Sequence, residues 1–363
     1  MKNTFGNSIS ITLFGESHGD MIGAVLDGLA PGIEIDRELI EKKLAERRPS
    51  GKISTSRVEA DEYRIVSGEF NDFTTGTPLC ILIPNENKRS SDYGANLARP
   101  GHADYTAECK YHGYQDYRGG GHFSGRVTAA LVAAGAIVLS ALEKKGISVG
   151  THIKELAGCS DRAFSCELAE DIKALSLADF PVLDTEAGER MKAKILEARE
   201  EGDSVGGVLE CAVCGLPAGV GEPWFDSAES VLSHALFAIP GIKGVEFGAG
   251  FDIARMKGSE ANDAFRCEGG KTVTETNNNG GINGGITNGM PIIFRVAVKP
   301  TPSIFKAQKT VDIKTGENAE LSLAGRHDPA IVHRARAVVD CLTAIAIADL
   351  LATHYGTDWL GAL

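Results

Sequence analysis

Residues 127–142 read VTAALVAAGAIVLSAL, an apolar run bounded by Arg126 and Glu143. A helix that crosses a membrane needs about 20 consecutive apolar residues, and this run is shorter. We therefore expect a helix over Val127–Lys145 that is buried in the core of a globular protein.

On either side of this helix, the sequence predicts strands and helices in separate blocks. Residues 8–14 alternate between apolar and polar side chains, as in a half-buried strand, and a second apolar strand follows over Met21–Leu29. Further strands are predicted over Tyr63–Gly68, Thr77–Pro84, Gly146–Leu156, Gly207–Cys214, Gly244–Ala254 and Met290–Val298. Further helices are predicted over Arg37–Arg48, Thr185–Glu201, Ser227–Ala238 and Arg336–His354. Because strands and helices do not alternate strictly, the pattern favours an α+β fold with mostly antiparallel sheets.

The charge of the chain argues against one class of partner and points to another. The formal net charge is −12, whereas proteins that bind nucleic acid usually carry a basic surface. Many basic residues nevertheless lie in or beside Gly/Pro-rich segments: Arg47, Arg48, Lys88, Arg89, Arg99, Arg118, Arg126, Lys243, Lys299, Arg326, Arg334 and Arg336. We expect about half of them to build a local site for an anionic ligand.

The cysteines point to a reducing compartment. The chain has eight cysteines, scattered along its length, and no secretory signal is visible. This predicts free thiols and a cytoplasmic location. Cys211 and Cys214 form a lone CxxC, and we expect both to be small apolar residues of a strand rather than a redox or zinc site.

Three histidines lie in glycine-bearing loops, each within two residues of a carboxylate. They are His18 in GESHG (residues 15–19), His102 in RPGHAD (residues 99–104) and His327 in GRHDP (residues 325–329). Histidine changes charge near neutral pH, and loops held by a rigid scaffold often carry catalytic groups. These loops therefore predict a site of proton transfer.

Two further segments are rich in glycine. Residues 277–289, NNNGGINGGITNG, tolerate positive φ, which predicts either backbone N–H groups that converge on an anion or a mobile linker. Residues 118–126, RGGGHFSGR, lead into the apolar helix, and such a loop before a helix N-terminus is suited to an anion. The second segment has neither the ending of a Walker A loop nor the GxGxxG spacing of a dinucleotide fold.

Three other functions fit parts of this pattern. Residues 15–19 match the G-x-S-x-G of serine hydrolases, but Ser17 would then need a strand–turn–helix context, and a strand is expected after it. A metal hydrolase would draw its ligands from His18, His102, His327, Asp104 and Asp328, although no local metal-binding spacing is present. A binding module without catalysis explains the glycine loops and leaves the histidine–carboxylate pairs without a role.

Taken in order, a set of short motifs resembles the chorismate synthase family over nearly the whole chain. The motifs are GESHG at 15–19, RRP at 47–49, DY at 92–93, RPGHADY at 99–105, DYRGGG at 116–121, EGDS at 201–204, GLPAG at 215–219, GIKGVE at 241–246, GGI at 284–286, KPT at 299–301 and GRHDP at 325–329. One motif alone is weak evidence, but the ordered set is specific.

The resemblance implies one intertwined domain over residues 1–363, with helices sandwiched between mostly antiparallel sheets. It implies a shikimate-pathway lyase that converts 5-enolpyruvylshikimate 3-phosphate to chorismate and phosphate by a 1,4-anti elimination. The implied cofactor is reduced FMN, used without net redox change, and NADP is associated with the family. Members are usually homotetramers, and no metal is implied.

The resemblance also implies roles for single residues. His102 is similar to the acid at the leaving phosphate, His18 to the residue that protonates the reduced flavin, and Asp328 to the carboxylate that helps to remove the substrate proton. The arginines expected to bind the anionic groups of the substrate are Arg47, Arg48, Arg99, Arg118, Arg126 and Arg334. Contacts to FMN are expected from His122, Phe123, Ser124, Pro240, Gly241, Gly284, Lys299, Pro300, Thr301, Pro302, Ser303 and Arg326.

One segment departs from the family pattern. Many members have GGGRSSAR where this chain has GHFSGR at residues 121–126. A fixed cation is replaced by the titratable His122, so phosphate affinity at this position would depend on pH. A hydroxyl is replaced by Phe123, which we expect to enter the core rather than to pack on the flavin.

Overall fold

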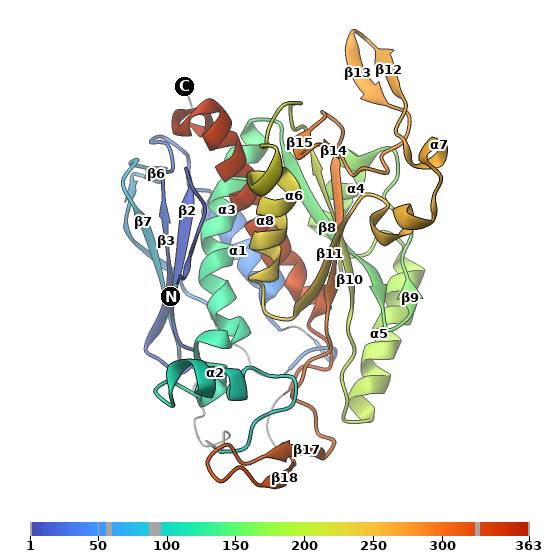
Figure 1. The fold of residues 1–363 in the computed structure, drawn as a ribbon. Coiled ribbons are helices and arrows are strands. Elements are labelled where there is room, and N and C mark those ends of the chain that lie inside the picture. Colours follow the sequence, from blue (N-terminus) through green and yellow to red (C-terminus); the bar gives the residue numbers. More distant parts are fainter. Residues whose placement is uncertain (1, 50, 56–59, 87–95, 324–326, 362–363) are drawn as a thin grey trace.

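Two five-stranded antiparallel sheets enclose a layer of helices (Figure 1). The computed structural model describes residues 2–49, 51–55, 60–86, 96–323 and 327–361. The first sheet has the order β1 (Thr4–Phe5), β2 (Ser10–Gly15), β3 (Met21–Asp27), β7 (Leu79–Pro84) and β4 (Arg64–Ser67). The second has the order β11 (Ile242–Phe247), β16 (Ile292–Val298), β10 (Gly207–Cys214), β8 (Ser148–Leu156) and β9 (Cys159–Ser160). Short hairpins are formed by β5 (Glu69–Phe70) with β6 (Phe73–Thr74), β12 (Phe265–Glu268) with β13 (Lys271–Thr274), β14 (Ile282–Asn283) with β15 (Ile286–Thr287), and β17 (Gln308–Val311) with β18 (Asn318–Leu321).

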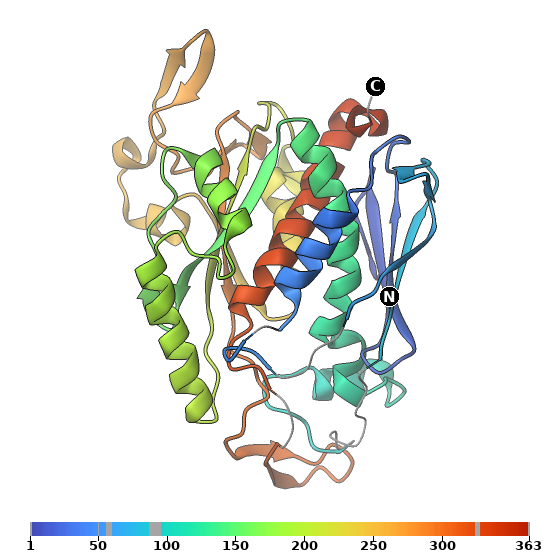
Figure 2. The same ribbon diagram turned by 180° about the vertical axis from the view of Figure 1, so that it is seen from behind.

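The helices fall into an inner and an outer group. Between the sheets lie α1 (Arg37–Arg47), α3 (Thr128–Lys144), α6 (Ala228–Phe237) and α8 (Val332–Tyr355). The others are α2 (Asp104–Tyr111), α4 (Leu168–Leu177), α5 (Thr185–Glu200) and α7 (Gly258–Ala261), and α4 and α5 lie on the outer side of the second sheet (Figure 2). Short 3-10 turns are η2 (Arg118–Phe123), η3 (Gly125–Val127), η4 (Trp224–Asp226), η5 (Gly250–Arg255) and η6 (Thr357–Leu360). One continuous apolar cluster joins both sheets through the inner helices.

The apolar run is the central helix α3, as expected. Every residue from Thr128 to Leu142 is buried. Its small side chains permit close packing on α8, where a β-carbon at Gly135 would lie 2.4 Å from that of Cys341. Residues 125–144 are apolar and long enough to cross a membrane, but 94% of the apolar window is buried inside the protein. The core explains this composition.

The last long helix, α8, holds the segment that leads into β2 of the first sheet. The carboxylate of Asp349, on α8, accepts backbone hydrogen bonds from Asn7, Ser8 and Ile9 at 2.7–3.0 Å. Asp349 is buried, and a buried carboxylate needs such partners. The start of the chain is thereby fixed by a residue near its end.

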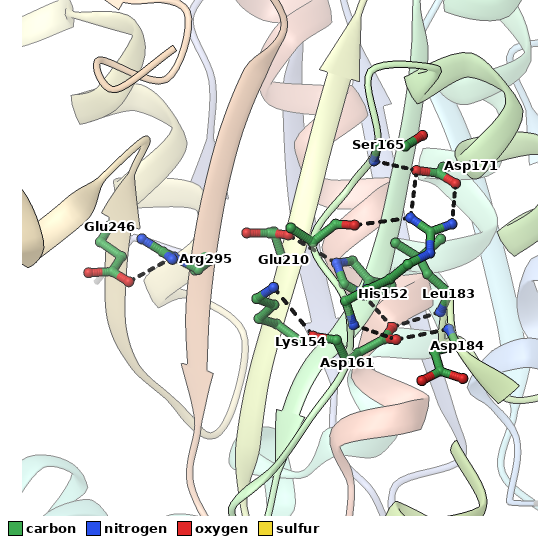
Figure 3. A network of polar contacts seen from close by, with 12 residues as sticks. His152, Lys154, Asp161, Ser165, Asp171, Leu183, Asp184, Glu210, Glu246 and Arg295 are labelled. Carbon is green, nitrogen blue, oxygen red and sulfur yellow. Dashed lines mark hydrogen bonds and ion pairs between the residues drawn. The ribbon is translucent and has the colours of Figure 1, made fainter. Parts of the chain in front are cut away.

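A buried polar network joins the outer face of the second sheet to the segment that covers it (Figure 3). His152 on β8 lies between two carboxylates, with Nδ1 2.8 Å from Asp161 and Nε2 3.0 Å from Glu210 of β10. Asp161 also accepts the backbone N–H groups of Leu183 and Asp184 at 2.7 and 2.9 Å. Burial lowers the pKa of His152, but the two carboxylates outweigh it and raise the pKa above its ordinary value.

The fold class predicted from the sequence is confirmed, while several element boundaries were wrong. The strand expected over 244–254 ends at Phe247, because the chain turns at Gly248 with φ of 56° and continues as η5. The last helix begins at Val332, four residues before the predicted start. The helices α2 and α4 were not predicted.

The structure resolves two open questions about loops and thiols. In the segment 277–289, the N–H groups of Asn278 and Asn279 do converge on an anion, the carboxylate of Asp263 at 2.7 and 2.9 Å. The segment is thus part of the fold rather than a linker. Cys211 and Cys214 lie on β10 as free thiols, and burial raises the pKa of each, which makes both poor nucleophiles.

Candidate active site

A cavity of about 970 Å³ opens where the inner helices end. The C-terminal ends of α1 and α6, the N-terminal end of α8 and the turns η2 and η3 line it. Seven basic side chains face it: Lys2, Arg47, Arg48, Arg126, Lys243, Lys299 and Arg334. Of the described residues that line it, the carboxylates are Asp61 and Asp328. This strongly cationic cavity lies in a chain of net charge −12, and it attracts anionic ligands.

Asp61 gathers three of the arginines around one buried carboxylate. Its Oδ2 accepts from Nη2 of Arg47 at 3.2 Å and from Nε of Arg48 at 3.3 Å, and its Oδ1 accepts from Nη1 of Arg126. Burial opposes ionisation of Asp61, but Arg47 and Arg126 outweigh it and hold the pKa of the carboxyl below its ordinary value. Burial also lowers the pKa of Arg47 to about 10, which leaves it cationic at neutral pH. Three guanidinium groups are thus held together for binding phosphate or carboxylate.

Asp328 and Arg334 form a second ion pair in the cavity, with Oδ2 and Nη1 2.5 Å apart. Oδ1 of Asp328 accepts from the backbone N–H of Thr55 at 2.8 Å. Nε of Arg334 donates to the carbonyl of Arg47 at 2.9 Å. The first turn of α8 is therefore joined to the end of α1, and both contribute charged groups to the cavity.

Two of the predicted histidines lie against the glycines of η2. A β-carbon at Gly119 would be 2.3 Å from Nδ1 of His18, and one at Gly120 would be 3.2 Å from Nε2 of His102. Both glycines have positive φ, 60° and 83°, which other residues rarely adopt. Three loops that are distant in sequence thus meet at the cavity, and glycine is required where they touch.

His102 is oriented by a carboxylate and an arginine. Its Nδ1 lies 2.8 Å from Oδ1 of Asp104, so Nδ1 carries a hydrogen and Nε2 is the nitrogen left to exchange a proton with a ligand. Arg99 donates to both oxygens of Asp104 at 2.7 and 2.8 Å. Burial opposes ionisation of Asp104, but Arg99 and His102 hold the pKa of the carboxyl well below its usual range.

His122 and Phe123, the residues at which this chain departs from the family pattern, also line the cavity. Nδ1 of His122 lies 2.8 Å from the carbonyl oxygen of Gly15 and donates to it. Nε2 is then the nitrogen available to a ligand. Phe123 is 36% exposed, lines the cavity and lies edge-on to Tyr111 with ring centroids 6.1 Å apart. The expectation that Phe123 enters the core was wrong, because the positive-φ glycines before it turn the chain along the surface.

Apolar side chains and backbone complete the cavity. The apolar part of the wall comes from Leu131 of α3, from Ile331 just before α8, and from Val338 and Leu342 within α8. The wall also includes residues expected to contact FMN: Ser124, Pro240, Gly241, Lys299, Pro300, Thr301, Pro302 and Ser303. The backbone N–H of Lys299 donates to Gly241 at 2.9 Å, which holds two of these segments together.

Some predicted site residues lie elsewhere. Arg118 does not line this cavity and pairs with Asp116 at 2.8 Å. Arg99 is engaged by Asp104 and lines an adjoining cavity of about 280 Å³. Gly284 lies in the turn of the β14–β15 hairpin. Its neighbour Gly285 accepts from Ala228 at the N-terminal end of α6, whereas the cavity lies at the C-terminal end of that helix. Arg326 lies outside the described residues.

The alternative chemistries find no support in this geometry. Ser17 is completely buried, and strand β3 follows it instead of a helix, so the serine-hydrolase context is missing. Among the described residues, no group of three or more His, Cys, Asp or Glu side chains is arranged to hold a metal ion.

Sequence reasoning missed Asp61, which lines the cavity, and Asn85, which contacts Arg126 behind it. Oδ1 of Asn85 accepts from Nε of Arg126 at 2.9 Å. Neither residue lies in a motif with a recognisable chemistry. Their partners are 13 to 69 residues away in the chain, so no local spacing signals them.

Comparison with known proteins identifies the family. The family model described as Chorismate synthase matches residues 9–352. The chain is 47% identical to the chorismate synthase of Thermococcus gammatolerans over 348 residues, which cover 95% of this chain and 96% of the relative. It is 48% identical to that of Dehalococcoides mccartyi strain BAV1 over 354 residues, 96% of each chain. A solved structure described as Crystal Structure of Chorismate Synthase superposes with a TM-score of 0.77 at 29% identity, over 97% of this chain and 94% of that one. The chain therefore belongs to the chorismate synthase family of carbon–oxygen lyases.

Proposed function

We propose that this protein converts 5-enolpyruvylshikimate 3-phosphate to chorismate and phosphate by 1,4-anti elimination, with reduced FMN bound beside the substrate. The single observation that carries the proposal is the charge of the cavity, seven basic side chains against Asp61 and Asp328. The substrate has two carboxylates and a phosphate, and guanidinium groups bind such anions in bidentate geometry. Arg47, Arg48, Arg126 and Arg334 are the proposed substrate ligands.

The cavity also fits a flavin. Ligand pockets commonly measure about 300–1,000 Å³ and combine apolar walls with a few polar groups, and this cavity of about 970 Å³ has both. FMN would be held by His122, Phe123, Ser124, Pro240, Gly241 and Lys299–Ser303. When bound there, reduced flavin would supply electron density to the substrate without net redox change. Gly284 and Arg118 do not line this cavity within one chain.

The protein's own groups handle the protons. In the elimination the C–O bond to phosphate breaks, a ring proton is lost and a new C=C bond forms. His102 holds a proton at Nε2 for the leaving phosphate, with Asp104 fixing the opposite nitrogen. Asp328 would help to remove the ring proton, and His18 would hold a proton for the bound flavin; both line the cavity. A positioned acid or base typically contributes about 10²–10⁴-fold in rate.

We further propose a cytoplasmic homotetramer whose flavin is reduced with electrons from NADPH or an external reductase. Large aromatic side chains that are exposed on one chain favour self-association. They include Trp224, Phe225, Phe251 and Phe265, at 67–91% exposure. Light scattering during gel filtration measures the assembly directly.

The proposed function is tested by anaerobic incubation of the protein with substrate and chemically reduced FMN, scoring phosphate release. Release with reduced FMN, and none with oxidised FMN, is the expected result. No release with reduced FMN would remove the proposal. Fluorescence titration with FMN alone separates a failure of cofactor binding from a failure of chemistry.

A further inference from the structure

Asn85 connects the turn that carries His18 to the arginine cluster. It follows strand β7 directly, and its side chain is buried. Oδ1 accepts from Nε of Arg126 at 2.9 Å, while Nδ2 donates to the carbonyl oxygens of Glu16 and Gly19 at 2.9 and 3.0 Å. Glu16 and Gly19 flank His18 on either side.

The partners fix both ends of this amide. A guanidinium N–H can only donate, so it requires the amide oxygen, and two carbonyl oxygens can only accept, so they require the amide nitrogen. Of the natural side chains, only Asn has an amide that is this short. The backbone N–H of Asn85 also donates to Asp20 at 3.0 Å, which attaches the same turn a third time.

Arg126 is held from the other side as well. Its Nη2 donates to the carbonyl of Pro84 at 3.0 Å, and its Nη1 donates to Asp61. The guanidinium is thus held against the end of β7, and the hydrogen bonds of Asn85 fix the His18 turn relative to it. Misplacing a catalytic group by about 1 Å can cost about 10²-fold in rate.

We infer that Asn85 is a positioning residue for the proposed reaction, which fixes His18 relative to the arginines that bind the substrate. The inference rests on the proposed function for its kinetic consequences. The contacts of Asn85 with Glu16, Gly19 and Arg126 carry it independently of any ligand.

The Asn85→Asp variant separates the contact with Arg126 from the contacts with the His18 turn. The retained Oδ1 still accepts from Arg126, whereas the second carboxylate oxygen repels the carbonyls of Glu16 and Gly19 and releases the turn. We expect kcat to fall by about 10- to 100-fold. The added negative charge should weaken binding of the anionic substrate, and this separate effect appears as a higher KM. Asn85→Leu releases both partners and should lower kcat and raise KM together.

A double-variant cycle distinguishes positioning of His18 from a general structural effect. If Asn85 acts through His18, adding Asn85→Asp to His18→Ala should lower kcat by less than about twofold more. Losses that multiply, or wild-type kcat in Asn85→Asp, would overturn the inference. Asn278→Asp is the matched control, because its amide also donates to two carbonyls, those of Glu260 and Ala261, away from the cavity. Its kcat should equal that of the wild type.

A spectroscopic measurement tests the inference without turnover. The imidazole ¹⁵N resonances of His18, assigned with His18→Ala, should shift in Asn85→Asp and stay in place in Asn278→Asp. Unchanged resonances in Asn85→Asp would overturn the role of Asn85. If the wild-type enzyme releases no phosphate, the proposed function fails, and this measurement still decides about Asn85.

Discussion

At the scale of single residues, His102 is the clearest test of the proton chemistry. Asp104 fixes the tautomer of His102 at 2.8 Å and leaves Nε2 for the ligand. We expect His102→Ala to lose at least about tenfold in turnover while FMN still binds, because the cavity retains its cations. Steady-state kinetics and FMN fluorescence measure the two effects. Wild-type turnover in this variant would contradict the role.

His122 stands where an arginine would offer a fixed cation. Its Nδ1 donates to the carbonyl of Gly15, so Nε2 is the nitrogen that faces a ligand. His122→Arg places a guanidinium at this position and should tighten FMN binding, because a guanidinium binds phosphate in bidentate geometry. Fluorescence titration with FMN measures the affinity. Equal affinities of the wild type and His122→Arg would argue against an anion contact at this position.

Single residues also show which parts of the site could be predicted from the sequence. The histidine–carboxylate loops were predictable because their partners are adjacent in the chain, as for His102 and Asp104. Asp61 and Asn85 were not predictable, because their arginine partners come from other elements and only folding brings them together. Arg118 differs, because its partner, Asp116, is two residues away in the chain and pairs with it at 2.8 Å outside the cavity.

At the scale of elements, the glycines of η2 determine where the loops of His18 and His102 meet. Gly119→Ala places a methyl group about 2.3 Å from His18 at a φ of 60°. A left-handed φ alone costs about 1–2 kcal/mol, so we expect at least this loss of stability and a lower kcat from displaced His18. Gly258→Ala is the control, since a β-carbon there meets no atom within 4 Å and α7 does not line the cavity. Equal melting temperatures and turnover in both variants would be inconsistent with this requirement.

The buried His152 network should stabilise the contact of β8 and β10 with the outer segment in a pH-dependent way. Its pKa is raised above the ordinary 6.5, so its contribution is complete below about pH 6.5 and is lost as the pH rises through the raised value. Because removing one partner from a buried ionic group costs about 3 kcal/mol, His152→Gln should lose about that much at pH 6. The deficit against the wild type should shrink toward pH 9.

Urea unfolding at several pH values measures this deficit. His354→Gln is the matched control, because His354 is exposed at the end of α8 and should change stability by less than about 0.5 kcal/mol. A deficit in His152→Gln that is independent of pH would show that packing, and not charge, holds the network.

Elements with a simple apolar pattern were predictable, and those shaped by tertiary contacts were not. The helix α3 was predictable from residues 127–142, because every side of it is buried and the run is therefore apolar throughout. The end of β11 was misjudged because Phe251 and Ile253 continue the apolar pattern on an exposed turn. The first turn of α8 was missed because it carries Arg334 into the cavity, so its composition is not that of a core helix.

At the scale of the whole molecule, opposite charges are separated between the cavity and the rest of the surface. A cationic cavity in an acidic protein draws in anionic ligands through electrostatic attraction, which salt screens over about 10 Å at 0.1 M. KM for the phosphorylated substrate should therefore rise severalfold between about 0.05 and 0.5 M salt, while kcat changes little. Kinetics in KCl and in a second monovalent salt measure this, and a constant KM would argue against long-range attraction.

The arrangement of two sheets around inner helices was not derivable from periodicity. The blocks of strands and helices indicated α+β, but the sandwich was expected only from the ordered motifs. Strand pairs such as β10 with β16, separated by about 80 residues, carry no local signal of their register. The cavity depends on that register, since α1, α6 and α8 contribute to it from three parts of the chain.

The contact of Asp349 with Asn7, Ser8 and Ile9 has a consequence for biosynthesis. Ribosomes add about 5–20 residues per second, so the N-terminal strands wait for many seconds before their last helix emerges. Until then the backbone N–H groups of Asn7, Ser8 and Ile9 lack the carboxylate that accepts from them, and a nascent chain that stalls before residue 349 leaves this segment unfixed. The attachment of the segment before β2 is therefore postponed until residue 349 has been synthesised and α8 has packed in place.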